Sequence, residues 1–159
     1  MVRRMLVSGC ALLLLVGAAV AADALEVALK DAKYTDAAGK DAASVGYNEG
    51  DGKAFFYTNG IVKSTVKADD DGEYTLTIDA SCDEANKMLA KIKILVNEKS
   101  VKDEFALTEA GMKAYKFDVK LTKGENKLHV EFLNDTYKEN EYDLNLYLHS
   151  VKFEKKKAK

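Results

Sequence analysis

The residues best suited to chemistry lie close together in segment 134–143, NDTYKENEYD, near the end of the 159-residue chain. Four of these ten residues carry carboxylates: Asp135, Glu139, Glu141 and Asp143. Carboxylates crowded into one short connection repel one another unless a cation lies among them. Calcium is the usual cation for such oxygen ligands outside the cell. The alternative, from spacing alone, is a solvated acidic loop that holds no ligand.

Two predicted strands must position this segment, one on each side of it. On both sides apolar residues alternate with polar ones, which is the pattern of a strand with one buried face. The apolar positions are Leu128, Val130 and Phe132 before the segment, and Leu144, Leu146 and Leu148 after it. We expect these two strands to pair with each other and so to bring the carboxylates between them together.

The first residues of the chain predict a signal peptide over 1–22. Arg3 and Arg4 form a basic start, an apolar run follows over 5–20, and small residues supply an A-x-A cleavage site before Asp23. The apolar run is too short and wrongly flanked for a membrane span. A secreted or periplasmic location follows from this interpretation.

A lipid anchor at Cys10 is the alternative interpretation of the same segment. The residues Val7-Ser8-Gly9-Cys10 resemble a lipoprotein box. The box lies very early, and most of the apolar region follows it rather than precedes it. We therefore prefer cleavage near Ala22.

Without Arg3 and Arg4, the mature chain carries 22 basic against 26 acidic groups, a net charge of −4. This balance argues against a nucleic-acid partner, which would require a basic face. Cys82 is the cysteine that remains, so an internal disulfide is excluded, and we expect its side chain to be buried as a small apolar group. We expect a monomer.

The rest of the chain predicts an all-β protein, because short alternating runs recur between turn signals and hardly any segment shows a helical period. Besides the two strands above, the predicted strands are 25–29, 53–58, 61–66, 73–80, 90–96, 101–106 and 113–121. Asn59-Gly60 predicts a tight turn that joins 53–58 to 61–66 as a hairpin. Segment 31–52 shows no sustained period and predicts a long loop.

About eight or nine short strands predict a jelly-roll-like antiparallel β-sandwich that forms one domain over 23–154. A parallel α/β architecture is excluded, since no amphipathic helices separate the strands. Residues 155–159, KKKAK, form a basic tail that we expect to be frayed and solvated.

Motifs for catalysis are missing from the sequence. The chain has no G-x-S-x-G, no H-E-x-x-H, no glycine-rich phosphate loop and no C-x-x-C. His129 and His149 fall on the outer faces of their strands, where surface or cross-strand roles are expected. A small glycoside hydrolase would need two carboxylates facing each other across a cleft, for which a small sandwich has little room. We therefore expect no enzymatic activity.

Two segments resemble a known signature. VEFLND at 130–135 and DLNLYL at 143–148 are similar to the C-terminal motif of the calcium-dependent xylan-binding carbohydrate-binding modules, families 36 and 60. Those modules typically show Asn-Asp at the end of one strand, then a short loop, then Asp-Arg-Asn-Leu-Tyr-Val. A looser likeness extends over 25–153.

The resemblance implies a β-sandwich that binds a xylan-like polysaccharide or oligosaccharide through Ca²⁺. It implies that Asp135 and Asp143 are the carboxylate ligands and that backbone carbonyls between Glu139 and Tyr142, Glu141 included, complete the coordination. Asn134 and Asn145 belong to the ligand-binding motif. Tyr137 and Tyr142 either lie against a sugar ring or pack within the loop.

One position departs from the family pattern, because Leu144 stands where the family has arginine. Calcium binding is therefore a safer inference than xylan specificity. The function predicted is a secreted, non-catalytic, calcium-dependent carbohydrate-binding module. The alternative is a structural or adhesive envelope protein that the same ion stabilises.

Overall fold

The computed structural model describes residues 24–157. The predicted signal peptide and Cys10 lie outside the described residues. Within 24–157, no helix is long and apolar enough to cross a membrane.

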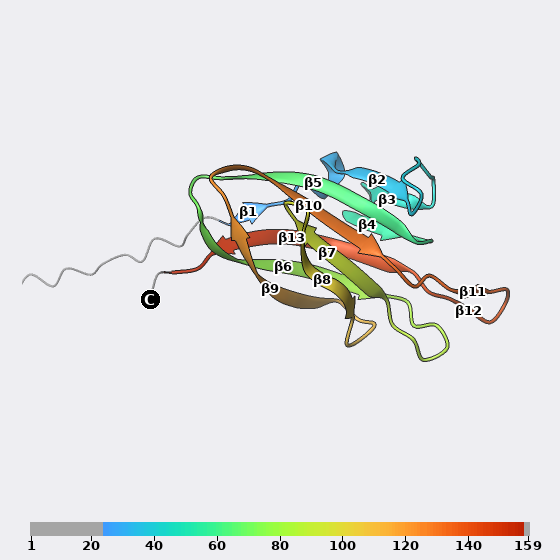
Figure 1. The fold of residues 1–159 in the computed structure, drawn as a ribbon. Helices are drawn as coiled ribbons and strands as arrows, with labels where there is room; N and C mark the ends of the chain where they lie inside the picture. The colour runs from blue at the N-terminus through green and yellow to red at the C-terminus, as the bar shows by residue number, and fades with distance from the viewer. Residues whose placement is uncertain (1–23, 158–159) are drawn as a thin grey trace, which may run out of the picture.

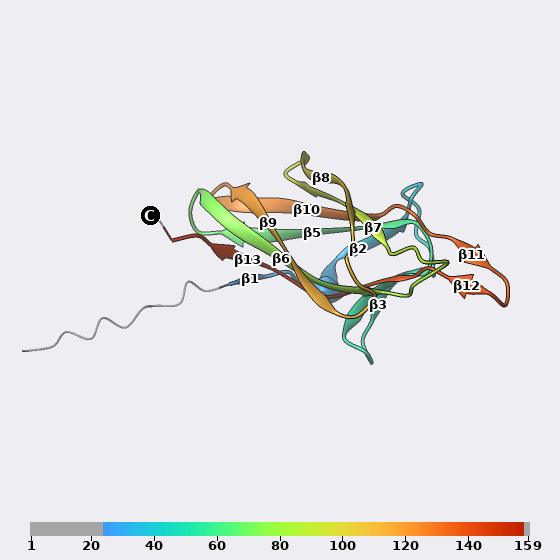
Figure 2. The same cartoon turned by 90° about the horizontal axis from the view of Figure 1, so that it is seen from below.

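Two antiparallel sheets stack face to face, and a small third sheet extends from one end of them (Figures 1 and 2). The six-stranded sheet has the order β3-β4-β13-β6-β9, with β1 paired to β13, and the five-stranded sheet has the order β2-β5-β10-β7-β8. The strands of the six-stranded sheet are β1 Leu25–Glu26, β3 Val45–Asn48, β4 Lys53–Phe56, β6 Gly72–Cys82, β9 Lys113–Leu121 and β13 Leu146–Lys155. Those of the five-stranded sheet are β2 Lys33–Asp36, β5 Gly60–Ala68, β7 Lys91–Val96, β8 Lys99–Ala106 and β10 Gly124–Phe132. This architecture confirms the predicted all-β sandwich.

The core lies between the two sheets, and the alternating residues predicted to face inward fill it. Leu128, Val130 and Phe132 of β10 are buried, and Leu146 and Leu148 of β13 oppose them from the other sheet. Cys82 is buried at the end of β6, as predicted. The apolar periodicity of these long strands arises because successive side chains point to opposite faces of a sheet and only one face packs against the other sheet.

The first third of the chain differs from the prediction. Segment 31–52 is not one long loop, because it contains β2 and β3, and segment 25–29 is a strand only at β1 before the 3₁₀ turn η1, Leu29–Asp31. Both missed strands have four residues and lie at sheet edges, where β2 pairs with the nine-residue β5 and β3 with the four-residue β4. Such short edge strands are held by their pairing rather than by a pattern of their own.

The predicted hairpin at Asn59-Gly60 is wrong, because β4 and β5 lie in opposite sheets. The chain crosses between the sheets here, and β4 pairs with β3 and β13 instead. Gly60 is required for close approach: an added Cβ would lie 2.6 Å from Cγ2 of Val45 and 2.9 Å from the carbonyl oxygen of Thr35.

Replacing Gly60 with alanine should therefore destabilise the fold. The added methyl group meets a backbone oxygen that cannot move freely, and we expect a loss of about 1–3 kcal/mol in the free energy of unfolding. Gly111 is the matched control, since a Cβ there meets nothing within 4 Å. Urea unfolding of the two alanine variants checks this: equal stabilities would show that the contact at Gly60 is not tight.

The end of the chain is more ordered than the predicted tail. β13 runs through Lys155, whose Nζ lies 2.8 Å from a carboxylate oxygen of Asp70. Lys156 Nζ lies 2.6 Å from a carboxylate oxygen of Asp118. The first two residues of segment 155–159 are therefore held by the turn between β5 and β6 and by β9 instead of being frayed.

Candidate functional site

The acidic segment folds back on itself as a short hairpin at one end of the sandwich (Figure 1). β11, Tyr137–Lys138, pairs with β12, Tyr142–Asp143, so that Tyr137 lies opposite Asp143. The N–H of Leu144 donates to the carbonyl of Thr136 at 2.9 Å and continues the ladder. The same register places Asp135 opposite Asn145, and opposite residues of an antiparallel pair share a face.

The expectation that the two flanking strands pair with each other is wrong. β10 lies in the five-stranded sheet between β5 and β7, whereas β13 lies in the six-stranded sheet between β4 and β6. Each has long partners in its own sheet, including β5 along the whole of β10 and β6 along nearly the whole of β13. The hairpin bridges the ends of the two sheets, and it is this hairpin that brings the aspartates together.

Asp135 and Asp143 lie close enough for their charges to interact. The pKa of Asp135 is raised, first by burial and then by the negative charge of Asp143. The N–H of Asp135 donates to Oδ1 of Asn59 at 2.7 Å, which fixes the backbone at this point. Oδ1 of Asp135 is buried and has no hydrogen-bond partner among the described residues. A buried carboxylate oxygen in this state requires a positive or donating partner.

Asn145 presents a second oxygen of the same kind. Its side-chain amide donates to Oδ2 of Asp143 at 3.1 Å and to Oδ2 of Asp83 at 3.0 Å. Those two bonds require the NH₂ group to face the carboxylates, so the amide oxygen points away from them. That oxygen is also buried without a partner, and Asn145 as a whole is only 7% exposed.

Asp83 completes the polar cluster, although no sequence motif pointed to it. It follows directly after β6, and its N–H donates to the carbonyl of Asn145 at 3.0 Å. Its Oδ2 also accepts from the hydroxyl of Tyr147 at 2.9 Å. Burial, and then this bond to Asp83, raise the pKa of Tyr147 well above its usual range, so Tyr147 stays a donor. Asp83 thereby orients Asn145 from a segment 62 residues away in the chain.

The two glutamates of the segment lie apart from this pair. Both are exposed at the turn of the hairpin, and Oε1 of Glu141 lies 2.6 Å from Nζ of Lys138. Among residues 24–157, no three acidic, histidine or cysteine side chains converge as a metal cluster. Any contribution of Glu139 and Glu141 must therefore come from their backbone carbonyls, as the resemblance implies.

Asn134 has a structural role in this arrangement. Its Oδ1 accepts from the N–H of Lys91 at 2.6 Å, and its NH₂ group donates to the carbonyl of Leu89 at 3.1 Å. Both ends of the amide are thus used within the protein. Asn134 ties the start of the hairpin to the loop before β7 and so positions its neighbour Asp135.

The aromatic residues near the hairpin divide into packed and exposed ones. Tyr142 is partly buried against the core, while Tyr137 is 66% exposed. Tyr57 is 49% exposed and immediately precedes Thr58 and Asn59, which contact Asp135. Tyr57 could not be expected here from its position in the sequence, because it lies just before a crossover between the sheets.

Neither histidine joins the site. His149 lies on β13, and its Nε2 is 2.8 Å from the hydroxyl oxygen of Ser81 on β6, a cross-strand contact. His129 lies on the outer face of β10, within ion-pair distance of Glu131. Leu144, where the family pattern has arginine, is fully buried, so the hairpin is anchored to the core at that position.

Comparison with known families gives this geometry its context. The family model for calcium-dependent, xylan-binding carbohydrate-binding modules, CBM60, matches residues 75–159. The chain belongs to the CBM60 family. The match includes Asp83, Asp135 and Asp143, whereas Tyr57, Thr58 and Asn59 lie outside the matched residues. No curated protein sequence matches the chain.

Solved structures share the fold of this CBM60 chain at low identity. A CBM36-1 domain of a multidomain xylanase from the hindgut metagenome of Trinervitermes trinervoides has a TM-score of 0.60, 11% identity, and coverage of 86% of this chain and 98% of its own. A family 35 module from Clostridium thermocellum has a TM-score of 0.57, 15% identity, and coverage of 83% and 98%. A CBM36 module in complex with calcium and xylotriose has a TM-score of 0.52, 12% identity, and coverage of 82% and 98%. These likenesses confirm the sandwich.

Proposed function

We propose that this chain is an exported, non-catalytic module that binds a xylan-like polysaccharide through a calcium ion held at the β11–β12 hairpin. One observation carries the proposal: Oδ1 of Asp135 and Oδ1 of Asn145 are buried without hydrogen-bond partners beside two aspartates that repel each other. Calcium accepts carboxylate, amide and carbonyl oxygens together. The donor set therefore fits the ion on which the CBM60 family depends.

The residues divide into ligands and supports. Asp135 and Asp143 would supply the charged ligands, Asn145 an amide oxygen, and the turn between Glu139 and Tyr142 backbone carbonyls. Bound there, a calcium ion supplies coordination positions for adjacent sugar hydroxyls. The supports are polar side chains whose hydrogen bonds fix the two strands of the hairpin: Asn59, Asp83 and Asn134.

Two exposed aromatic rings extend the surface beside the aspartates. Tyr137 is on the hairpin itself, and Tyr57 precedes the crossover that contacts Asp135. An exposed tyrosine ring offers a face that can stack against a sugar while its hydroxyl stays in water. Tyr142 packs against the core, so of the two hairpin tyrosines Tyr137 is the one we assign to the glycan.

Titration calorimetry with xylo-oligosaccharides tests the proposal. We expect binding in calcium chloride and none after the addition of a chelator. Tyr57→Ala and Tyr137→Ala should each weaken glycan affinity about tenfold by removing a stacking ring. Because neither ring is a calcium ligand, the same variants should keep the calcium-induced rise in Tm.

Two outcomes would contradict this function. Glycan binding that persists with chelator would show that calcium does not mediate recognition. A calcium-induced rise in Tm without any glycan response would favour the structural or adhesive role, in which the ion only stabilises the sandwich.

A further inference from the structure

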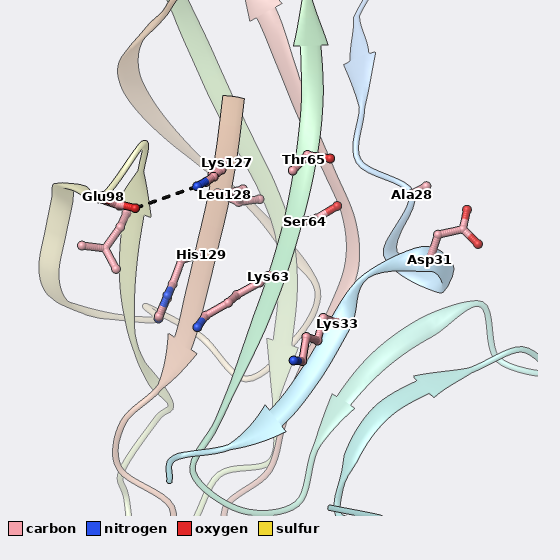
Figure 3. Close-up of a pocket in the computed structure, with 11 residues that line it drawn as sticks. Ala28, Asp31, Lys33, Lys63, Ser64, Thr65, Glu98, Lys127, Leu128 and His129 are labelled. Carbon is pink, nitrogen blue, oxygen red and sulfur yellow. Dashed lines mark ion pairs between the residues drawn. The ribbon is translucent and has the colours of Figure 1, made fainter. Parts of the chain in front are cut away.

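A hollow lies away from the hairpin, on the outer face of the five-stranded sheet (Figure 3). Its volume is about 650 Å³, within the range of about 300–1,000 Å³ that is usual for small-ligand sites. Residues of β2, β5, β7 and β10 line it, together with Ala28 and Asp31 around η1. Nothing in the proposed calcium site makes use of this face.

Basic residues form a row across the floor of the hollow. The strand register places Lys33 opposite Lys63, and Lys63 opposite His129, on three successive strands. Figure 3 shows Lys63 extended across β10 toward the imidazole of His129, with Lys33 beside it. Like charges directly opposite each other on a sheet are destabilising. Within residues 24–157, neither Lys33 nor Lys63 has a carboxylate within salt-bridge distance.

The remaining charges around the row leave it positive. Lys127 lies 4.0 Å from Glu98, and Asp31 stands at the rim. The pKa of His129 is lowered, first by burial and also by Lys63 and Lys93, while Glu131 acts in the opposite direction. Nε2 of His129 is buried and makes no hydrogen bond with the described residues, and Oε2 of Glu131 lies 3.5 Å from it.

We propose that this hollow binds the carboxylate of a uronate residue on an acidic polysaccharide. The side chains of Lys33 and Lys63 start from opposite positions on paired strands, and each can donate a charge-assisted hydrogen bond to a carboxylate that lies between them. Thr65 lines the hollow on the same face of β5 as Lys63, and its hydroxyl group suits a hydroxyl of the sugar ring. The assignment of a glycan, rather than another anion, rests on the proposed function.

The position of the hollow suits a polysaccharide that also reaches the calcium site. His129 lies on β10 and Asp135 follows three residues after the end of that strand, so the six residues between them span at most roughly 20 Å. A glycan held at one site has a raised effective concentration at the other. Acidic side groups on one chain would therefore strengthen its binding without any change at the hairpin.

Binding of tri-galacturonate by the chain, measured by calorimetry with a chelator present, tests the inference. Fully methyl-esterified tri-galacturonate is the matched ligand, because it lacks only the negative charges. We expect binding of the acid, weaker binding at high salt, and none of the ester. Lys33→Gln/Lys63→Gln should lower the affinity about tenfold. The control Lys102→Gln/Lys116→Gln removes two exposed charges elsewhere and should change the affinity less than about twofold.

The imidazole signal of His129 gives an independent readout by NMR. Tri-galacturonate should shift it and raise the pKa of His129, since a nearby anion favours the charged imidazole. Equal affinity in the Lys33→Gln/Lys63→Gln variant, or an unmoved His129 signal, would overturn the assignment. Equal binding of inorganic phosphate or of a sulfated oligosaccharide would overturn the choice of a carboxylate sugar.

Asp143→Asn separates this inference from the calcium site. The variant should still bind tri-galacturonate, whatever its response to calcium and xylan. Loss of tri-galacturonate binding in Asp143→Asn would place the carboxylate at the hairpin and overturn the second site. Failure of xylan binding alone would leave the tri-galacturonate result standing and would count only against the calcium-mediated function.

Discussion

Asp143→Asn is expected to remove most of the calcium response of the protein while leaving the sandwich folded. The change keeps the shape of the side chain and an acceptor oxygen, but it removes one of the two charges that we assign to the ion. Loss of a charged ligand should weaken calcium binding about 100-fold. At a calcium concentration 100 times the wild-type Kd, the ion stabilises the wild type by about 2.7 kcal/mol.

The readout is the Tm with and without calcium. For a domain of this size we expect a rise of about 10 °C in the wild type and about 2 °C in the variant. Glu139→Gln and Glu141→Gln are the matched controls, because each variant keeps the backbone carbonyl and changes only an exposed side chain. Both controls should respond like the wild type. A full calcium response in Asp143→Asn would show that the ion binds elsewhere.

The second large effect concerns pH and Asp135. Burial and the charge of Asp143 raise the pKa of this carboxyl, so it takes up a proton at a higher pH than an ordinary aspartate. Calcium ligands must be deprotonated. Below the pKa of Asp135, calcium affinity should therefore fall about tenfold for each pH unit. Competition with a chromophoric chelator across the acidic range measures this fall.

Without calcium, the negative charge of Asp135 should lower the stability of the fold instead of supporting it. The raised folded-state pKa means that the unfolded chain holds the charged form of Asp135 more readily than the folded chain does. The contribution of Asp135 to folding is thus most favourable below its unfolded pKa and is lost as the pH rises through the folded pKa. At neutral pH, Asp135→Asn should therefore stabilise the calcium-free protein, because it removes this charge.

The variant also removes the pH dependence that we assign to Asp135, since asparagine does not titrate. Calcium affinity should be low and nearly constant over the pH range in which the wild type changes. Wild-type affinity that stays constant down to the ordinary pKa of aspartate would contradict the inferred repulsion between Asp135 and Asp143.

Long strands with one buried face could be predicted from sequence. β9 has the bounds predicted for it, and β10 and β13 show the predicted alternation, because their side chains pack against a full core. The short edge strands β2 and β3 could not, since four residues carry too little pattern. The Asn59-Gly60 pair was misleading, because a local turn signal does not reveal which sheet the next strand joins.

The candidate site, like the fold, could be predicted from the sequence only in part. The resemblance of 130–135 and 143–148 to the family motif singled out Asp135 and Asp143, and the structure does bring them together. Asn59 and Asp83 contact the hairpin from 76 and 62 residues away, so spacing along the chain could not select them. Glu139 and Glu141 contribute half of the carboxylates of segment 134–143, but their side chains are exposed and lie apart from Asp135 and Asp143.

Three residues beside the site lie outside the segment that matches the family model and can be mutated separately. Tyr57, Thr58 and Asn59 come from the crossover before β5, and the CBM60 match begins at residue 75. These residues contact or flank Asp135, so under the proposed function we expect their mutation to change glycan affinity.

A crystal structure of the chain grown with calcium and a xylo-oligosaccharide would show directly whether an ion at the hairpin holds the glycan. We expect one ion with oxygens of Asp135, Asp143 and Asn145 at about 2.3–2.6 Å, and with sugar hydroxyls on its open side. An ion bound elsewhere, or a filled glycan site with Asp135 and Asp143 free of metal, would contradict this expectation.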